Sequence, residues 1–234
     1  MKKLITYSII LLSGIVNFKA QEITEEKKGY KYGNNFELTL SSNGNHHATA
    51  ISWVKFHTIS KKGNFKIGYG VRINSQFGKD LTYITAPAKL TVKPENIDTF
   101  IVSSPQNNSI NLSINLQYSF KNKLDLGFNI DALGASFGGK VNGKYVSHQS
   151  SNNGTTHSAS PTSFNLLLVG DNDIGMLNSE FYFRYWFNKK FALKAGASFL
   201  FTEYTTSHKL RLDNNRWRHK AMQGLIGITF SPFR

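Results

Sequence analysis

The strict alternation of apolar and polar residues between Ile110 and Ile130 is the feature that most limits how this chain can fold. Apolar side chains occupy every second position up to Phe120, and the pattern resumes at Leu124 after the short polar segment 121–123. Successive side chains of a strand point to opposite faces, so this period of two predicts a β-hairpin with one apolar and one polar face. The apolar face contacts either a protein core or lipid, and the alternation alone does not distinguish the two.

The same alternation recurs along the chain and predicts eight strands. They are expected at about 34–43, 49–60, 65–74, 110–120, 124–130, 178–187, 191–204 and 221–231. The second segment has an ambiguous pattern. We expect Val54 and Phe56 to face outward there, because the alternate positions hold Lys55 and His57.

The connections between these segments differ in length in a regular way. Short turns are expected at 61–64, 121–123 and 188–190, a modest one at 44–48, and long polar loops at 78–109, 138–177 and 205–220. Short and long connections alternate, which places the short turns together at one end of an up-and-down sheet. Barrels of the outer membrane have this asymmetry, with short periplasmic turns and long external loops.

The first twenty residues have the character of a secretory signal peptide. Lys2 and Lys3 precede the apolar segment 5–16, and a cleavage-site pattern ends at Ala20. A transmembrane helix needs about 20 apolar residues, and this segment is shorter. We therefore expect a signal peptide at 1–20, a short periplasmic segment at 21–33 and a barrel at 34–234.

Aromatic residues flank the predicted short turns and the end of the last strand. They are Phe65, Tyr118, Phe120, Tyr185, Phe187, Phe191 and Phe230. Aromatic rings favour the interface between membrane and water, so these positions predict a girdle at the turn end of a barrel. Together with the asymmetry of the connections, they indicate that the apolar face of each strand contacts lipid and that the polar face lines the interior.

At this point the chain resembles the small eight-stranded outer-membrane β-barrels of Gram-negative bacteria, of the OmpA/OmpX type. The segment 222–230 is similar to the C-terminal strand that such proteins present to the barrel-assembly machinery, although four residues follow Phe230. The resemblance implies an all-β, eight-stranded, up-and-down antiparallel transmembrane barrel in the outer membrane. It implies location more strongly than activity.

Charged residues lie on the expected inner face, although an eight-stranded barrel is just wide enough for side chains to fill it. They are Glu37, Lys66, Arg72, Asp125, Asp131, Glu180, Arg184 and Lys194. Buried charges must be paired. We therefore predict a plug of salt bridges in the lumen, and a narrow path for solutes or ions stays open as the alternative.

The chain is basic, with 28 Lys and Arg residues against 14 Asp and Glu residues. An exported basic protein more readily meets an anionic membrane surface than nucleic acid. We expect Arg211, Arg216 and Arg218 to bind phosphates of lipopolysaccharide, with Trp217 at the membrane interface. The sequence does not identify an external ligand or protein partner.

Three further patterns are weak as functional sites. The segment 171–175 resembles part of a calcium loop but lacks the final acid, and it fits a polar turn better. His46-His47 has no second pair at metal-binding spacing, and His148 with Ser150 or Ser151 lacks a rigid setting. We therefore expect no catalytic residue, cofactor or metal. A soluble periplasmic lipocalin-like lipid carrier and a lipid-modifying barrel enzyme stay open as alternative functions.

Overall fold

The computed structural model describes residues 33–120 and 123–232 of the chain. The predicted signal peptide at 1–20, and the segment that follows it up to residue 32, lie outside the described residues. Within the described ranges, thirteen strands form one sheet. The helices there are the short α2 (Ala88–Thr91), η1 (Pro94–Asn96), η2 (Gly170–Asn172) and η3 (Arg211–Asp213). None of them is long and apolar enough to cross a membrane.

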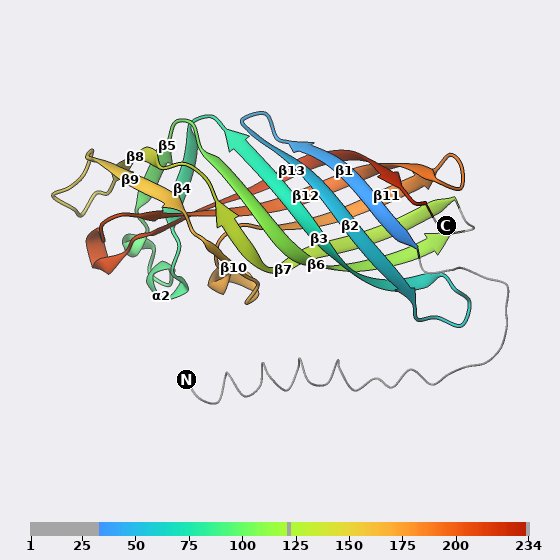
Figure 1. The fold of residues 1–234 in the computed structure, drawn as a ribbon. Coiled ribbons are helices and arrows are strands. Elements are labelled where there is room, and N and C mark those ends of the chain that lie inside the picture. The colour runs from blue at the N-terminus through green and yellow to red at the C-terminus, as the bar shows by residue number, and fades with distance from the viewer. Residues whose placement is uncertain (1–32, 121–122, 233–234) are drawn as a thin grey trace.

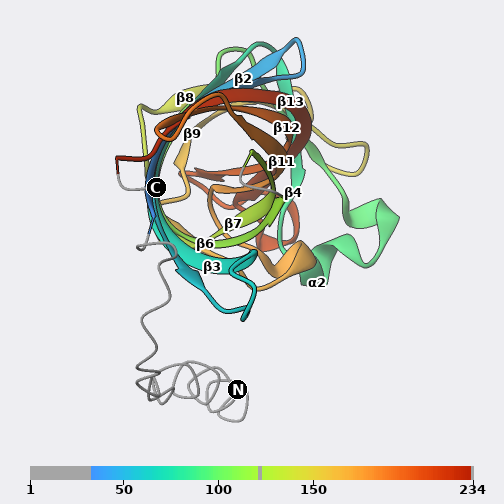
Figure 2. The same cartoon turned by 90° about the vertical axis from the view of Figure 1, so that its right-hand side faces the viewer.

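Long antiparallel strands form a closed circuit, which Figure 2 shows along its axis. In pairing order they are β1 (Asn34–Ser42), β2 (His46–Thr58), β3 (Phe65–Gly78), β6 (Gln106–Phe120), β7 (Leu124–Phe137), β11 (Leu177–Trp186), β12 (Phe191–Thr206) and β13 (Arg216–Phe230). The last of them pairs with β1 and closes the circuit, with Phe36 opposite Phe230. The predicted all-β, closed antiparallel sheet is confirmed.

Shorter strands form a second circuit within the segments that were predicted to be long loops. They are β4 (Leu81–Thr85), β5 (Thr99–Val102), β8 (Val141–Val146) and β9 (Thr156–Pro161), which connect β13 to β12. The outermost ends of β12 and β13 and these four strands are called the cap here (Figure 1, left). The two circuits together include every strand of the sheet except β10 (Phe164–Leu166), which pairs with β7. The sheet is larger than the predicted one.

Burial alternates along the long strands, with polar side chains buried and apolar side chains exposed. This is the reverse of the pattern in a soluble protein. In β6, Asn111 is 1% exposed and faces the interior, whereas its neighbour Leu112 is 53% exposed and faces outward. Large apolar side chains on the outer face of the main circuit are commonly about half-exposed, as at Leu38, Ile73 and Phe183. Contiguous apolar surface of this extent is unusual for a soluble monomer.

The facing of β2 differs from the prediction. Val54 and Phe56 point into the interior and are 2% and 4% exposed. Across the β2–β3 pairing they lie opposite Gly70 and Gly68, and a Cβ atom on Gly68 would come within 2.8 Å of Phe56 Cδ1. The two glycines therefore leave the space that these side chains fill. Lys55 takes the outward position, against the expectation from its charge.

Candidate functional site

A chain of ion pairs with alternating charge runs through the interior of the main circuit. Its members, in order of contact, are Asp131, Arg72, Glu180, Lys194, Glu37, Arg184 and Asp125. The side chains in this chain are at most 3% exposed. Removing a charge from water is costly unless an opposite charge and hydrogen bonds replace the water, and here every base lies between two acids.

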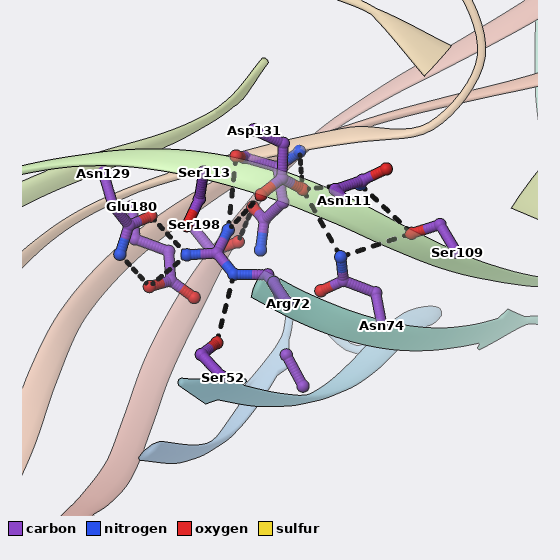
Figure 3. Close-up of polar contacts among 12 residues, drawn as sticks. Ser52, Arg72, Asn74, Ser109, Asn111, Ser113, Asn129, Asp131, Glu180 and Ser198 are labelled. Atoms are coloured by element: carbon purple, nitrogen blue, oxygen red, sulfur yellow. Dashed lines mark hydrogen bonds and ion pairs between the residues drawn. The ribbon is translucent and has the colours of Figure 1, made fainter. Parts of the chain in front are cut away.

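Arg72 lies near one end of this chain of ion pairs and contacts side chains of β2, β7 and β11 (Figure 3). Its guanidinium lies 3.1 Å from Asp131 Oδ1 and 3.2 Å from Glu180 Oε2, and its Nε donates to Ser52 Oγ at 3.4 Å. The other carboxylate oxygen of Asp131 accepts a hydrogen bond from Asn111 at 2.8 Å. Amide and hydroxyl side chains of the predicted polar face thus form hydrogen bonds with the buried charged groups.

Lys194 and Arg184 continue the chain toward the turn end. Lys194 Nζ lies 2.6 Å from Glu180 and 2.7 Å from Glu37, so one ammonium group bridges β11 and β1. Arg184 pairs with the other oxygen of Glu37 and lies 3.6 Å from Asp125. The predicted lumen residues therefore come together, although none of the pairings could be read from the sequence.

Lys66, the remaining predicted member, lies opposite Gln117 at the turn end of β3. It is half-buried, unlike the seven buried members of the chain.

Aromatic side chains fill the space beside the ion pairs. Lys194 Nζ lies 4.1 Å from the centroid of the Tyr182 ring, and the Arg184 guanidinium carbon lies 4.9 Å from it. Gly127 lies opposite Tyr182, where a Cβ atom would come within 2.3 Å of the ring. The interior at this level is packed with side chains.

The cap has an apolar core of its own. It contains Leu81, Tyr83, Phe100, Val102, Tyr145, Ala159, Tyr204, Leu210 and Trp217. The Trp217 ring stacks on Phe100 at 5.4 Å between centroids and meets the edge of Tyr145 at 5.7 Å. The sequence analysis missed this core, because all of its members except Tyr204 lie in segments that were expected to be long polar loops.

No protein-family model and no curated protein matches the chain. Among solved structures it is similar to Neisserial surface protein A, with 10% identity and a TM-score of 0.37 over 85% of this chain and 94% of that one. It is similar to the Yersinia pestis outer membrane protein Ail (8% identity, TM-score 0.37, 86% and 99% covered). It is also similar to the N-terminal β-barrel domain of Pseudomonas aeruginosa OprF (10%, 0.34, 86% and 99%). The barrel itself is established by the strand pairings described above.

Trp217 does not lie at a membrane interface, and that prediction is wrong. The side chain is 1% exposed within the cap core, and its Nε1 donates a hydrogen bond to Thr206 Oγ1 at 3.3 Å. The prediction failed because 205–220 was expected to be a loop, whereas β13 begins at Arg216 and its alternation turns Trp217 inward.

The arginines predicted to contact lipopolysaccharide bind groups of the protein instead. Arg216 makes a two-pronged ion pair with Glu203 at 2.7 and 2.9 Å. Arg218 donates to the backbone carbonyl oxygens of Asp171 and Asp173 at 3.0 and 2.8 Å. Arg211 donates to the carbonyl oxygen of Glu95 at 3.1 Å and to Gln149. These contacts connect the segment 211–218 with β12, with η1 and η2, and with the turn between β8 and β9.

The segment 171–175, which resembles part of a calcium loop, contacts Arg216, Arg218 and Lys220. Lys220 donates to Asp171 at 2.7 Å, and this hydrogen bond and charge lower the pKa of the Asp171 carboxyl. Asp173 Oδ1 accepts from the backbone N–H of Leu168 at 2.7 Å, as in a polar turn. Within the described residues, no group of three or more His, Cys, Asp or Glu side chains is arranged to hold a metal ion.

The enzyme-like pattern has no supporting geometry. His148 is exposed in the turn between β8 and β9, and Ser150 Oγ accepts a hydrogen bond from the backbone of Asn152 at 3.2 Å. Among the described contacts, no hydrogen bond joins His148 to Ser150 or Ser151.

The predicted girdle residues lie on the outer face at the turn end. Three pairs of them are in ring contact: Tyr118 with Phe120, Tyr185 with Phe187, and Phe191 with Phe230, while Phe65 is 36% exposed nearby. A second group of outward aromatic residues lies at the other end of the strands, which the sequence analysis missed. It comprises Phe77, Phe137 and Phe164, which are 50–55% exposed. The outward alternation of β3 continues past Ile73 to Phe77, and that signal could have revealed this group.

Proposed function

We propose that this protein is an integral outer-membrane barrel whose interior is closed to solutes and whose cap stands outside the cell. The observation that carries the proposal is the exposed apolar band of the main circuit, bounded by aromatic residues at both ends. Phe65 and Phe77 are twelve positions apart in β3. That corresponds to about 40 Å of strand, or roughly 28–33 Å of height at a tilt of 35–45°, which fits the hydrocarbon core of a bilayer.

In this proposal the eight strands of the main circuit span the membrane. Their backbone groups are paired around the circuit, which is the condition for a sheet in lipid. The short turns face the periplasm and the cap faces outward. Assembly by the barrel-assembly machinery, through the C-terminal strand β13, belongs to the same proposal.

Two features support a closed interior. The chain of ion pairs connects β1, β3, β7, β11 and β12 across the lumen, and the cap, with an apolar core of its own, continues the sheet beyond the outer end of the main circuit. This favours a structural or surface-contact role over a narrow solute path. The inner face is polar and the outer face apolar, which is the reverse of what a soluble lipocalin-like lipid carrier needs.

Lipid contact belongs to the outward band and its aromatic ends. The outer leaflet supplies lipopolysaccharide in this setting, and the upper aromatic residues would lie at its boundary. Arg216 and Arg218 are not part of this proposed contact, because their guanidinium groups bind Glu203 and the backbone carbonyl oxygens of Asp171 and Asp173.

The chain contains no cysteine, so single replacements test the proposed orientation directly. Lys144 is exposed in β8 of the cap, and Lys189 is exposed in the turn between β11 and β12. In intact cells, a membrane-impermeant maleimide should label Lys144→Cys, whereas Lys189→Cys should be labelled only after the outer membrane is permeabilised. Labelling of both in intact cells, or recovery of the protein in the soluble periplasmic fraction, would refute the proposal.

Planar-bilayer recordings test the closed interior separately. The purified protein should give no stable conductance step under conditions in which a porin does. A reproducible step would show that solutes pass the ion pairs and the cap.

A further inference from the structure

Several buried polar side chains at and below the edge of the cap core carry atoms without a hydrogen-bond partner. Among the described residues, thirteen buried side-chain polar atoms lack a hydrogen-bond partner, and seven of these belong to His46, Gln76, Tyr83, Asn107, Thr202 and His219. Ring contacts and strand register connect these residues with one another. An unsatisfied buried polar atom costs about 1–3 kcal/mol, so a cluster of them points to something that binds there.

Two histidines belong to this group, and each has one ring nitrogen in a hydrogen bond and the other without a partner. His219 Nδ1 lies 2.8 Å from the backbone carbonyl oxygen of Thr82, which can only accept, so Nδ1 is the donor. His46 Nε2 forms a hydrogen bond with Gln76 Oε1, and with the amide in this orientation the ring nitrogen is the donor. The remaining atoms, His219 Nε2 and His46 Nδ1, carry lone pairs, and both are buried without a partner.

This is the arrangement of metal-binding histidines. Such a ring typically donates its second N–H to a carbonyl or carboxylate oxygen, which orients the ring and leaves the other nitrogen free to bind the ion. Two neighbouring lone pairs cannot satisfy each other. They need a donor or a cation between them.

The spacing of the rings fits one ion held by both. The ring centroids are 5.1 Å apart, with an angle of 61° between the planes. With a metal–nitrogen distance of about 2.0–2.1 Å, a tetrahedral ion lies about 3.2 Å from each centroid, and the two centroids are then about 5 Å apart.

We propose that His46 and His219 bind a divalent transition-metal ion of the zinc and copper type, between the lumen and the cap. Imidazole ligands suit these ions. The Tyr83 and Thr202 hydroxyl groups, which lie near each other and near Gln76, or water molecules complete the coordination. The site joins β2, β13 and β4, so a bound ion would link the main circuit to the cap.

Cobalt is a suitable probe, because Co²⁺ occupies zinc sites and its visible absorption reports tetrahedral coordination. The full mature protein, folded in detergent micelles and treated with a chelator, is titrated with Co²⁺ and then with competing Zn²⁺. We expect saturation at one ion per chain, displacement by Zn²⁺, and a rise in the thermal unfolding temperature that the chelator reverses.

His219→Leu and His46→Leu should each weaken Co²⁺ binding by a factor of at least about ten, with the heat-modifiability shift confirming that each variant is folded. His47→Leu is the matched control, because His47 is adjacent to His46 but lies on the outer face and bonds Ser42. It should bind Co²⁺ like the wild type.

The titration of the wild-type protein tests whether the ion binds, even if a variant fails to fold. If folded wild-type protein shows no saturable binding, water alone satisfies these atoms and the proposal is wrong. Equal loss of binding in His47→Leu would likewise overturn it, since the ion would then lie outside the barrel. Neither result bears on the proposed membrane orientation, which the labelling experiment tests independently.

Discussion

At the scale of single residues, the interior of this barrel depends on basic groups that each lie between two acids. Arg184 is the clearest case, since it lies between Glu37 and Asp125 and also donates to Thr229 Oγ1 at 3.0 Å. Its replacement leaves two buried carboxylates with one base fewer between them. The sequence could identify these residues by their parity in each strand, but it could not identify partners that lie as far apart in the chain as Glu37 and Arg184.

Replacing Arg184 by Met should therefore lower the free energy of unfolding by about 3–5 kcal/mol, the cost of leaving buried charges unpaired. Lys190→Met is a suitable comparison, because Lys190 is exposed in the turn, and it should change stability by no more than about 0.5 kcal/mol. Urea unfolding in detergent or lipid vesicles, followed by tryptophan fluorescence, measures both. Equal effects of the two replacements would mean that the ion pairs contribute nothing specific.

At the scale of elements, the long strands were predictable because a period of two over ten or more residues is a strong signal. The cap strands were not predictable. β5 and β10 contain only four and three residues, and their partners are set by the fold rather than by local sequence. The prediction of which side chains of β2 face outward was wrong for a related reason. The space for Phe56 and Val54 in the interior is left by Gly68 and Gly70, and these glycines lie on another strand.

The outward face of β6 offers a test of lipid contact that depends on depth. Ile114 is 47% exposed in the middle of the apolar band, whereas Phe120 is 43% exposed at the turn end. Ile114→Arg should destabilise the inserted barrel by about 2–4 kcal/mol, and Phe120→Arg by no more than about 1 kcal/mol. Unfolding in lipid vesicles measures the difference. If the two variants were equally stable, the band would not lie in hydrocarbon.

At the scale of the whole molecule, the cap and the main circuit are two packed units with different interiors. Trp217→Ala removes the centre of the cap core and should cost about 3–5 kcal/mol there. We expect the variant to keep the heat-modifiability of a folded barrel, while limited proteolysis cuts the cap segments around β5 and β8 faster than in the wild type. Complete loss of the folded band on the gel would instead show that the two units unfold as one.

The hairpin of β12 and β13 is a wall of both circuits, and it follows the other strands of the sheet in chain order. Neither circuit can close until this hairpin is in place, so both should close in one late step of assembly. The contacts that define β1–β13, β9–β12 and β4–β13 join segments far apart in sequence, which makes that step slow. With the cap outside the cell, as proposed above, we expect the segments that become β4, β5, β8 and β9 to cross the membrane before this step, while the sheet is still open. The proposed orientation thus implies an order of events during biogenesis: translocation of the cap segments first, and closure second.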